Sequence, residues 1–122
     1  MAHKILLVDD SPTVLLMERM VLSKLACELV TAKDGQEAVE KAEAERPDLI
    51  LMDVVMPRLN GYEACRQLRE NEVTRDTPII LLTTRGEFTS AQSGYEAGCN
   101  DYLTKPINGV ELLAKVKSIL GI

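Results

Sequence analysis

The sequence predicts an α/β fold in which five helices cover the two faces of one doubly wound, five-stranded parallel sheet. Short apolar runs alternate along the chain with longer segments of helical periodicity, which is the pattern of strand–helix–strand units. Most of these runs are continuously apolar, as expected for strands that are buried on both faces of a parallel sheet. The predicted strands are Ile5–Val8, Glu28–Ala32, Leu49–Met52, Ile79–Leu82 and Tyr102–Leu103.

The first predicted helix begins at Ser11, an N-cap residue that is followed by proline in the first helical position. At helical spacing, its apolar stripe consists of Val14, Met17, Val21 and Leu25. Further apolar side chains lie outside this stripe, namely Leu15, Leu16, Met20 and Leu22. We therefore expect a helix that is either unusually well buried or in contact with a partner.

The other four helices are predicted from capping residues, glycines and prolines at their ends. Their boundaries are Asp34-Gly35 to Arg46-Pro47, Asn60-Gly61 to about Asn71, roughly Thr89–Ala97, and near Asn108 to Gly121. The fourth helix has the weakest signal because glycines lie around and inside it, and we expect it to be mobile.

Composition and charge narrow the class of protein. The chain has 122 residues, of which 46% are hydrophobic, so we expect one domain over residues 1–122 and no output domain. Its net charge is −5 without any run of Lys or Arg, which argues against nucleic-acid binding. We expect no signal peptide, because only four apolar residues precede the first two aspartates. No apolar run reaches membrane-spanning length, and the three cysteines lack metal-site spacing. We expect a cytoplasmic protein without a membrane partner.

Polar side chains follow four of the five predicted strands. Asp9 and Asp10 follow the first strand, Asp53 the third, Thr83 the fourth and Lys105 the fifth. Ligands of open parallel sheets bind at the carboxyl ends of the strands, so these side chains should meet at one edge. Two carboxylates about 4 Å apart repel by ~4 kcal/mol at an effective dielectric near 20, and a divalent cation such as Mg²⁺ relieves that repulsion. An aspartate beside a metal ion and a lysine suits phosphoryl transfer.

Five motifs in this order carry a resemblance to a known family. They are Val8-Asp9-Asp10, Leu51-Met52-Asp53-Val54-Val55-Met56-Pro57, Asn60-Gly61, Pro78-Ile79-Ile80-Leu81-Leu82-Thr83, and Gly98-Cys99-Asn100-Asp101-Tyr102-Leu103-Thr104-Lys105-Pro106. Over essentially the whole chain, the sequence resembles the response-regulator receiver domain in its free-standing, CheY-like form. The resemblance implies a flavodoxin-like sheet with the strand order 2-1-3-4-5.

The resemblance implies a role for each acidic residue. Asp53 would be the phosphoacceptor. Mg²⁺ would be held by Asp53, by Asp10 directly, by Asp9 largely through water, and by the backbone carbonyl of Val55. Mn²⁺ would be able to substitute for Mg²⁺.

The resemblance also implies which residues respond to the phosphoryl group. Lys105 would pair with it and would precede a cis peptide bond to Pro106. Thr83 would be the switch hydroxyl that moves onto the phosphoryl oxygens, and Tyr102 would be the aromatic side chain that moves with it. Val55 and Arg85 stand where this family tunes hydrolysis of the acyl phosphate, so the phosphoryl lifetime stays open.

A receiver of this kind is expected to be a signalling switch rather than an enzyme. The phosphodonor would be the phosphohistidine of a histidine kinase or histidine phosphotransfer protein, and small acyl phosphates would substitute for it. Output to a protein target would occur through the fourth helix, fifth strand and fifth helix, in chemotaxis, motility or a phosphorelay. We expect a monomer, and dimerisation on activation stays open.

Three other functions fit parts of the pattern. A haloacid-dehalogenase-type phosphatase would need an acid two residues after the nucleophile, where this chain has Val55. An FMN-binding flavodoxin would need a Ser-, Thr- or Gly-rich loop in place of Asp9-Asp10, which would repel a phosphate. A receiver-fold adaptor that binds partners without being phosphorylated remains the alternative.

Overall fold

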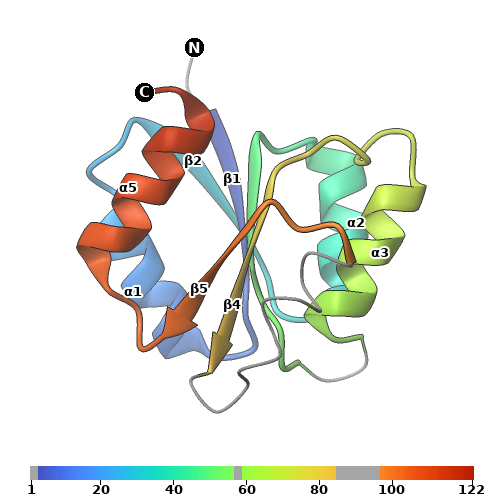
Figure 1. Ribbon diagram of the computed structural model, residues 1–122, viewed down its shortest axis with the longest axis horizontal. Helices are drawn as coiled ribbons and strands as arrows, with labels where there is room; N and C mark the ends of the chain where they lie inside the picture. The colour runs from blue at the N-terminus through green and yellow to red at the C-terminus, as the bar shows by residue number, and fades with distance from the viewer. Residues whose placement is uncertain (1–2, 57–58, 85–96) are drawn as a thin grey trace.

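One parallel sheet forms the centre of the computed structural model, which describes residues 3–56, 59–84 and 97–122 (Figure 1). Its strands are β1 (His3–Val8), β2 (Cys27–Ala32), β3 (Leu49–Asp53), β4 (Ile79–Thr84) and β5 (Asp101–Lys105). All neighbouring strands are parallel, and their order is β2-β1-β3-β4-β5. This confirms the predicted fold class and strand order, although four strands extend one or two residues beyond their predicted apolar runs and β5 extends three.

Helices cover both faces of the sheet. Within the described ranges they are α1 (Pro12–Leu22), α2 (Gly35–Glu45), α3 (Gly61–Glu70) and α5 (Gly109–Leu120). Helices α1 and α5 lie on one face, and α2 and α3 lie on the other (Figure 1). The fourth predicted helix falls almost entirely on residues 85–96, outside the described residues. None of the helices that the structure describes has both the length and the hydrophobicity of a membrane span.

Side chains cap the helices where the sequence predicts it. The backbone N–H groups of the first turns donate to the side-chain oxygens of Ser11, Asp34, Asn60 and Asn108. At α3 the cap is reciprocal, because the Glu63 carboxylate also accepts from the Asn60 N–H at 3.2 Å. These caps start α1 and α3 immediately after Asp10 and the loop that follows Asp53, so local sequence determines where the chain leaves the sheet edge.

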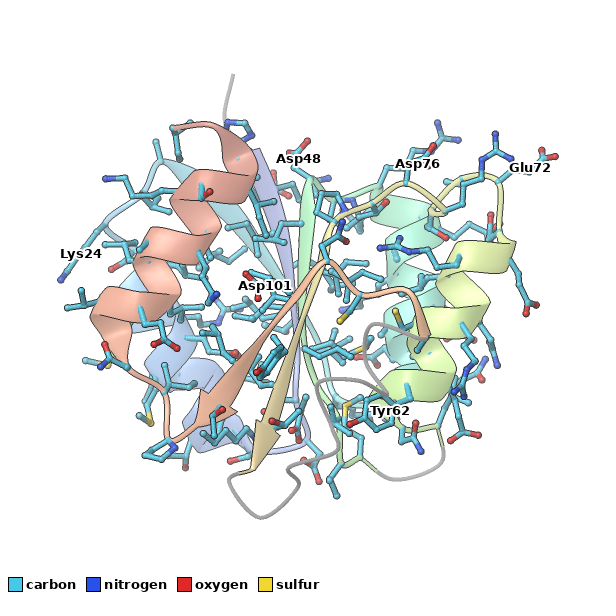
Figure 2. All side chains as sticks on the ribbon, in the orientation of Figure 1. Lys24, Asp48, Tyr62, Glu72, Asp76 and Asp101 are labelled. Atoms are coloured by element: carbon cyan, nitrogen blue, oxygen red, sulfur yellow. The ribbon has the colours of Figure 1, made fainter. Side chains whose placement is uncertain are left out.

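The sheet separates two apolar cores. Successive strand residues point to opposite faces, so Leu6 and Val8 pack with α2 and α3, whereas Ile5 and Leu7 pack with α1 and α5. Strands β3 and β4 alternate in the same way, and their residues 49–53 and 79–83 are all buried. Charged side chains such as Asp48, Glu72 and Asp76 project outward, at the end of the molecule where the strands begin (Figure 2). The buried strands therefore form a rigid platform for the polar residues at their carboxyl ends.

The face that α1 turns to the core differs from the prediction. Met17, which helical spacing places on the core stripe, is 42% exposed, whereas Glu18 and Leu22 are fully buried. Leu16 and Met20 are 57% and 65% exposed, so the prediction of an unusually well buried helix is wrong. Val21 and Leu25 of the predicted stripe do pack on the same side as Leu22. The core-facing stripe therefore departs from the prediction at Met17, whose place is taken by Glu18.

Candidate functional site

The predicted site residues meet at the carboxyl edge of the sheet. Asp9 directly follows β1, Asp53 is the last residue of β3, and Lys105 is the last residue of β5. The Lys105 ammonium lies 3.1 Å from Asp53 Oδ1 and 3.2 Å from Asp9 Oδ2. Residues 44 to 96 positions apart in sequence are thus joined by one cation, as the strand-end argument predicts.

Three carboxylates form a cluster that suits a hard cation. One oxygen from each of Asp9, Asp10 and Asp53 lies within 4.8 Å of the others. Asp9 and Asp53 are 1% and 5% exposed, whereas Asp10 is exposed, so the cluster is open on the side of Asp10. Carboxylate oxygens with access to water are the ligands that Mg²⁺ takes in proteins. The donor set therefore fits Mg²⁺, with Lys105 as the cation that faces two of the three acids.

Burial and neighbouring charges shift the pKa values of both Asp53 and Lys105. Burial raises the pKa of Asp53, and repulsion by Asp9 and Asp10 raises it further, against the lowering effect of Lys105. Burial alone would lower the pKa of Lys105, but its contacts with Asp53 and Asp9 outweigh burial and leave that pKa raised. Negative charge is thus in excess at this edge, which favours the arrival of a further cation.

The predicted switch residues lie beside this pair. Thr83 is buried on β4, between the strands that end in Asp53 and Lys105, and its Cα pairs with that of Thr104. Tyr102 is half-buried on β5 and packs against the core beneath α2 and α3. The peptide bond from Lys105 to Pro106 is cis, as predicted. The Val55 side chain is 59% exposed just beyond Asp53, and its role as a carbonyl ligand stays a prediction.

Gly61 allows α3 to begin close to the backbone of β3, the strand that ends in Asp53. Its N–H donates to the Val54 carbonyl at 2.8 Å. A Cβ atom at this position would lie 2.5 Å from the Asp53 carbonyl oxygen and 2.9 Å from Val54 Cα. Only glycine therefore lets α3 start this close to Asp53.

We expect Gly61→Ala to destabilise the protein by about 1–3 kcal/mol, because backbone atoms must move to admit the methyl group. Urea denaturation followed by circular dichroism would measure this loss. Gly109→Ala is the matched control, since Gly109 also starts a helix after an asparagine cap. Its added Cβ would meet only the Val21 side chain, with Cγ2 at 3.3 Å and Cγ1 at 3.9 Å, and no backbone atom within 4 Å. Equal loss in both variants would contradict the steric account.

Glu18 is a buried acidic residue that the sequence analysis did not single out. It is 0% exposed, and within the described residues neither carboxyl oxygen has a hydrogen-bond partner. Desolvation, followed by repulsion from Asp9, raises the pKa of Glu18 to about 8. The signal that would have placed it inward is its spacing from Leu15 and Leu22, which share its face of α1.

The free energy of unfolding should therefore depend on Glu18 and pH. Between the ordinary pKa near 4.5 and the folded-state pKa of about 8, the unfolded chain loses a proton that the folded chain keeps. The stabilisation contributed by the neutral Glu18 carboxyl group is fully present below about pH 4.5. Between that pH and about pH 8, the free energy of unfolding falls by about 1.4 kcal/mol for each pH unit. Urea denaturation at a series of pH values should show this decline in the free energy of unfolding for the wild type but not for Glu18→Gln. The same pH dependence in both proteins would contradict the assignment to Glu18.

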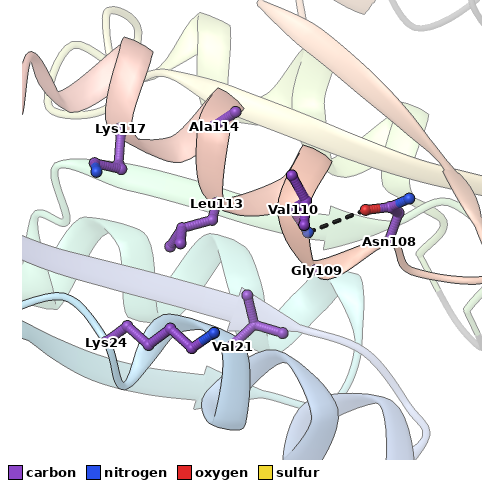
Figure 3. Close-up of a pocket in the computed structure, with 8 residues that line it drawn as sticks. All are labelled: Val21, Lys24, Asn108, Gly109, Val110, Leu113, Ala114 and Lys117. Carbon is purple, nitrogen blue, oxygen red and sulfur yellow. Dashed lines mark hydrogen bonds between the residues drawn. The ribbon is translucent and has the colours of Figure 1, made fainter.

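A hollow lies away from these acids, between α1 and α5 (Figure 3). It has a volume of about 420 Å³ and is lined by Val21, Lys24, Asn108, Gly109, Val110, Leu113, Ala114 and Lys117. The Asn108 side-chain oxygen in its wall is engaged by the Val110 N–H at 3.0 Å (Figure 3). Because its lining contains no carboxylate, this hollow does not offer phosphoacceptor chemistry.

Comparisons with known proteins show which family the chain is similar to. Residues 5–117 match the family model of the response regulator receiver domain. The chain is 42% identical over 120 residues to the alkaline phosphatase synthesis transcriptional regulatory protein PhoP of Bacillus subtilis, covering 98% of this chain but only about half (49%) of that relative's length. It is 40% identical to Protein PilH of Pseudomonas aeruginosa over 97% of this chain and 98% of that protein.

A solved receiver domain is similar to this chain in both fold and sequence. The receiver domain of the sensor histidine kinase PA1611 from Pseudomonas aeruginosa, which holds a magnesium ion in its active-site cleft, is similar to this chain with a TM-score of 0.90. The two chains are 37% identical, and the similarity covers 100% of each.

Proposed function

Because this chain belongs to the response regulator receiver domain family, we propose that it is a single-domain switch that accepts a phosphoryl group on Asp53. The contact between Asp53 Oδ1 and the Lys105 ammonium at 3.1 Å, beside two further carboxylates, carries this proposal. A nucleophilic carboxylate next to a fixed cation and a set of oxygen ligands is what phosphoryl transfer requires. The protein would act as a signalling component of a two-component system rather than as an enzyme.

The placement of the side chains supports the following transfer. An Asp53 carboxylate oxygen attacks the phosphorus of a phosphohistidine on a histidine kinase or phosphotransfer protein, forming an O–P bond as the P–N bond breaks. Lys105 supplies positive charge to the phosphoryl oxygens, and the Thr83 hydroxyl donates to one of them. Mg²⁺, when held by Asp9, Asp10, Asp53 and the Val55 carbonyl, would neutralise further phosphoryl charge. The leaving imidazole keeps the bonding electron pair and takes a proton.

Output would use the surface that includes β5 and α5. Thr83 pairs with Thr104 on β5, so movement of Thr83 toward a phosphoryl group acts directly on the strand that carries Tyr102. The Lys115 ammonium donates to the Asp101 carboxylate at 2.8 Å and ties β5 to α5. We assign target docking to this surface together with the fourth predicted helix, in chemotaxis, motility or a phosphorelay.

Incubation with acetyl phosphate tests the proposal. Intact-mass spectrometry should show one phosphoryl adduct on the wild type with Mg²⁺ and none when the cation is chelated, because excess negative charge at the site repels the donor. Beryllofluoride, a phosphoryl analogue, controls for rapid hydrolysis of the adduct. Absence of both the adduct and beryllofluoride binding would reject the phosphoryl switch in favour of a phosphorylation-independent adaptor.

A further inference from the structure

The hollow between α1 and α5 has the size of a small-molecule site. Its volume of about 420 Å³ lies within the range of roughly 300–1,000 Å³ that is usual for ligand pockets. Gly109 keeps it open, because a Cβ atom added there would lie 3.3 Å from Val21 Cγ2 on the facing helix. The missing side chain of Gly109 therefore leaves space between the two helices at the start of α5.

The α5 wall of the hollow is an apolar stripe that ends in a charge. Its lining residues Val110, Leu113, Ala114 and Lys117 follow one another at intervals of three, one and three positions, so they share one face of the helix. Leu113 is half-buried, and Val110 is 82% exposed. Water thus covers apolar surface on this wall, and a ligand with an apolar body would displace that water favourably.

Two lysines give the hollow a positive charge. Lys24, in the turn after α1, and Lys117, on α5, both line it on the side away from Asn108 (Figure 3). Within the described ranges neither ammonium has an ion pair or a hydrogen bond, whereas Lys115 on α5 is paired with Asp101 at 2.8 Å. None of the described lining residues is acidic, although the chain has a net charge of −5. The hollow is therefore a basic site on an acidic protein, and it lacks a counter-charge.

We propose that this hollow binds an amphiphilic anion, namely a carboxylate with a medium-length alkyl chain. The alkyl chain lies against Val21, Val110 and Leu113 and removes their exposed surface from water. The carboxylate lies between Lys24 and Lys117 and accepts hydrogen bonds from both ammonium groups. An inorganic anion would match only the basic part of the wall, and an uncharged apolar molecule only the rest.

A single free molecule is the occupant that the shape and charge of the site favour. The hollow is recessed between two helices, so a molecule inside it has a wall on either side (Figure 3). An anionic lipid surface would meet the whole protein, whose net negative charge repels it. The hollow shares no residue with the cluster of Asp9, Asp10 and Asp53, so this inference does not depend on the phosphoryl switch.

Titration with decanoate, followed by the amide chemical shifts in ¹H–¹⁵N NMR spectra, tests the basic part of the site. In the wild type the shifts should be confined to the hollow and saturate at one bound decanoate. Lys24→Gln/Lys117→Gln should bind decanoate about tenfold more weakly, because two exposed charge contacts are lost, and should bind decanol as the wild type does. Lys33→Gln/Arg66→Gln is the matched control, since it removes the same charge from exposed residues next to α2 and on α3. It should bind decanoate as the wild type does.

Val110→Ser tests the apolar part of the site without changing any charge. It should weaken the binding of decanoate and decanol by the same factor, roughly three- to tenfold, because less apolar surface is covered. The Val110 side chain is so exposed that the fold does not depend on it. Val73→Ser is the matched control, because Val73 is a 41% exposed apolar residue in the turn after α3, and it should leave both affinities unchanged.

Three results would overturn the inference. Absence of decanoate-induced shifts at the hollow would exclude the site. Equal affinity of the wild type for decanoate and decanol, or undiminished decanoate binding by Lys24→Gln/Lys117→Gln, would indicate an apolar docking face for a protein segment instead. Co-sedimentation with phosphatidylglycerol vesicles through the same lysines, without binding of free decanoate, would indicate a lipid surface. Each result leaves the phosphoryl switch standing, because incubation with acetyl phosphate tests that function separately.

Discussion

Asp53→Asn should abolish the phosphoryl adduct while the protein stays folded. The amide lacks the anionic oxygen that attacks phosphorus, but it has nearly the same shape and fills the same buried place at the end of β3. The change removes a desolvated charge and its repulsion with Asp9, at the loss of one contact with Lys105. These effects oppose each other, so we expect the stability to change by no more than about 1–2 kcal/mol.

Intact-mass spectrometry after incubation with acetyl phosphate and Mg²⁺ measures the first effect, and urea denaturation measures the second. Asp76→Asn is the matched control, because the Asp76 side chain is 96% exposed and Asp76 lies before β4, at the opposite edge of the sheet. That variant should be phosphorylated as the wild type is. An adduct of undiminished yield on Asp53→Asn would place the acceptor on another residue.

Lys105→Ala should have two large effects with one cause. Its ammonium faces Asp9 and Asp53, which are both almost fully buried. Removing one partner of a buried ion pair costs roughly 3–5 kcal/mol, and we expect the lower end because the Lys105 side chain remains 21% exposed. Phosphorylation should slow by about 10²-fold or more, because a fixed charge no longer stabilises the phosphoryl oxygens.

Mg²⁺ should return part of the lost stability of Lys105→Ala, since the cation neutralises the same carboxylates. Urea denaturation with and without Mg²⁺ would measure this recovery, and the rate of adduct formation would measure the second effect. Lys115→Ala is the comparison variant, because that lysine pairs with Asp101 at 2.8 Å away from the acid cluster. Phosphorylation of Lys105→Ala at the wild-type rate would refute the role of the lysine.

The meeting of the site residues at one edge of the sheet was predictable from a local sequence pattern together with one rule of sheet topology. Asp9, Asp53 and Lys105 each end or follow a run of apolar residues, and parallel strands bring such positions to a common edge. The capping signals at Ser11, Asp34, Asn60 and Asn108 are equally local, so the helix starts agree with the structure.

The orientation of α1 was not predictable in the same way. Its sequence contains apolar residues on more than one face, so helical periodicity permits several stripes. Packing against β1, β2 and α5 selects the stripe with Leu22, and this also buries Glu18. Acids are almost never fully buried without a partner, so sequence statistics favour an exposed position for Glu18. Only the assembled layers reveal the exception.

The start of β1 and the end of α5 lie together at one end of the molecule, while the acid cluster lies where the strands finish, at the other end (Figure 1). A sensor chip, a fluorescent protein or an affinity tag joined to either terminus would therefore be separated from Asp53 by the length of the sheet. Immobilised protein would present its acidic edge to solution. Binding of a phosphodonor or a beryllofluoride complex can thus be followed on a tethered sample without obstruction by the tether.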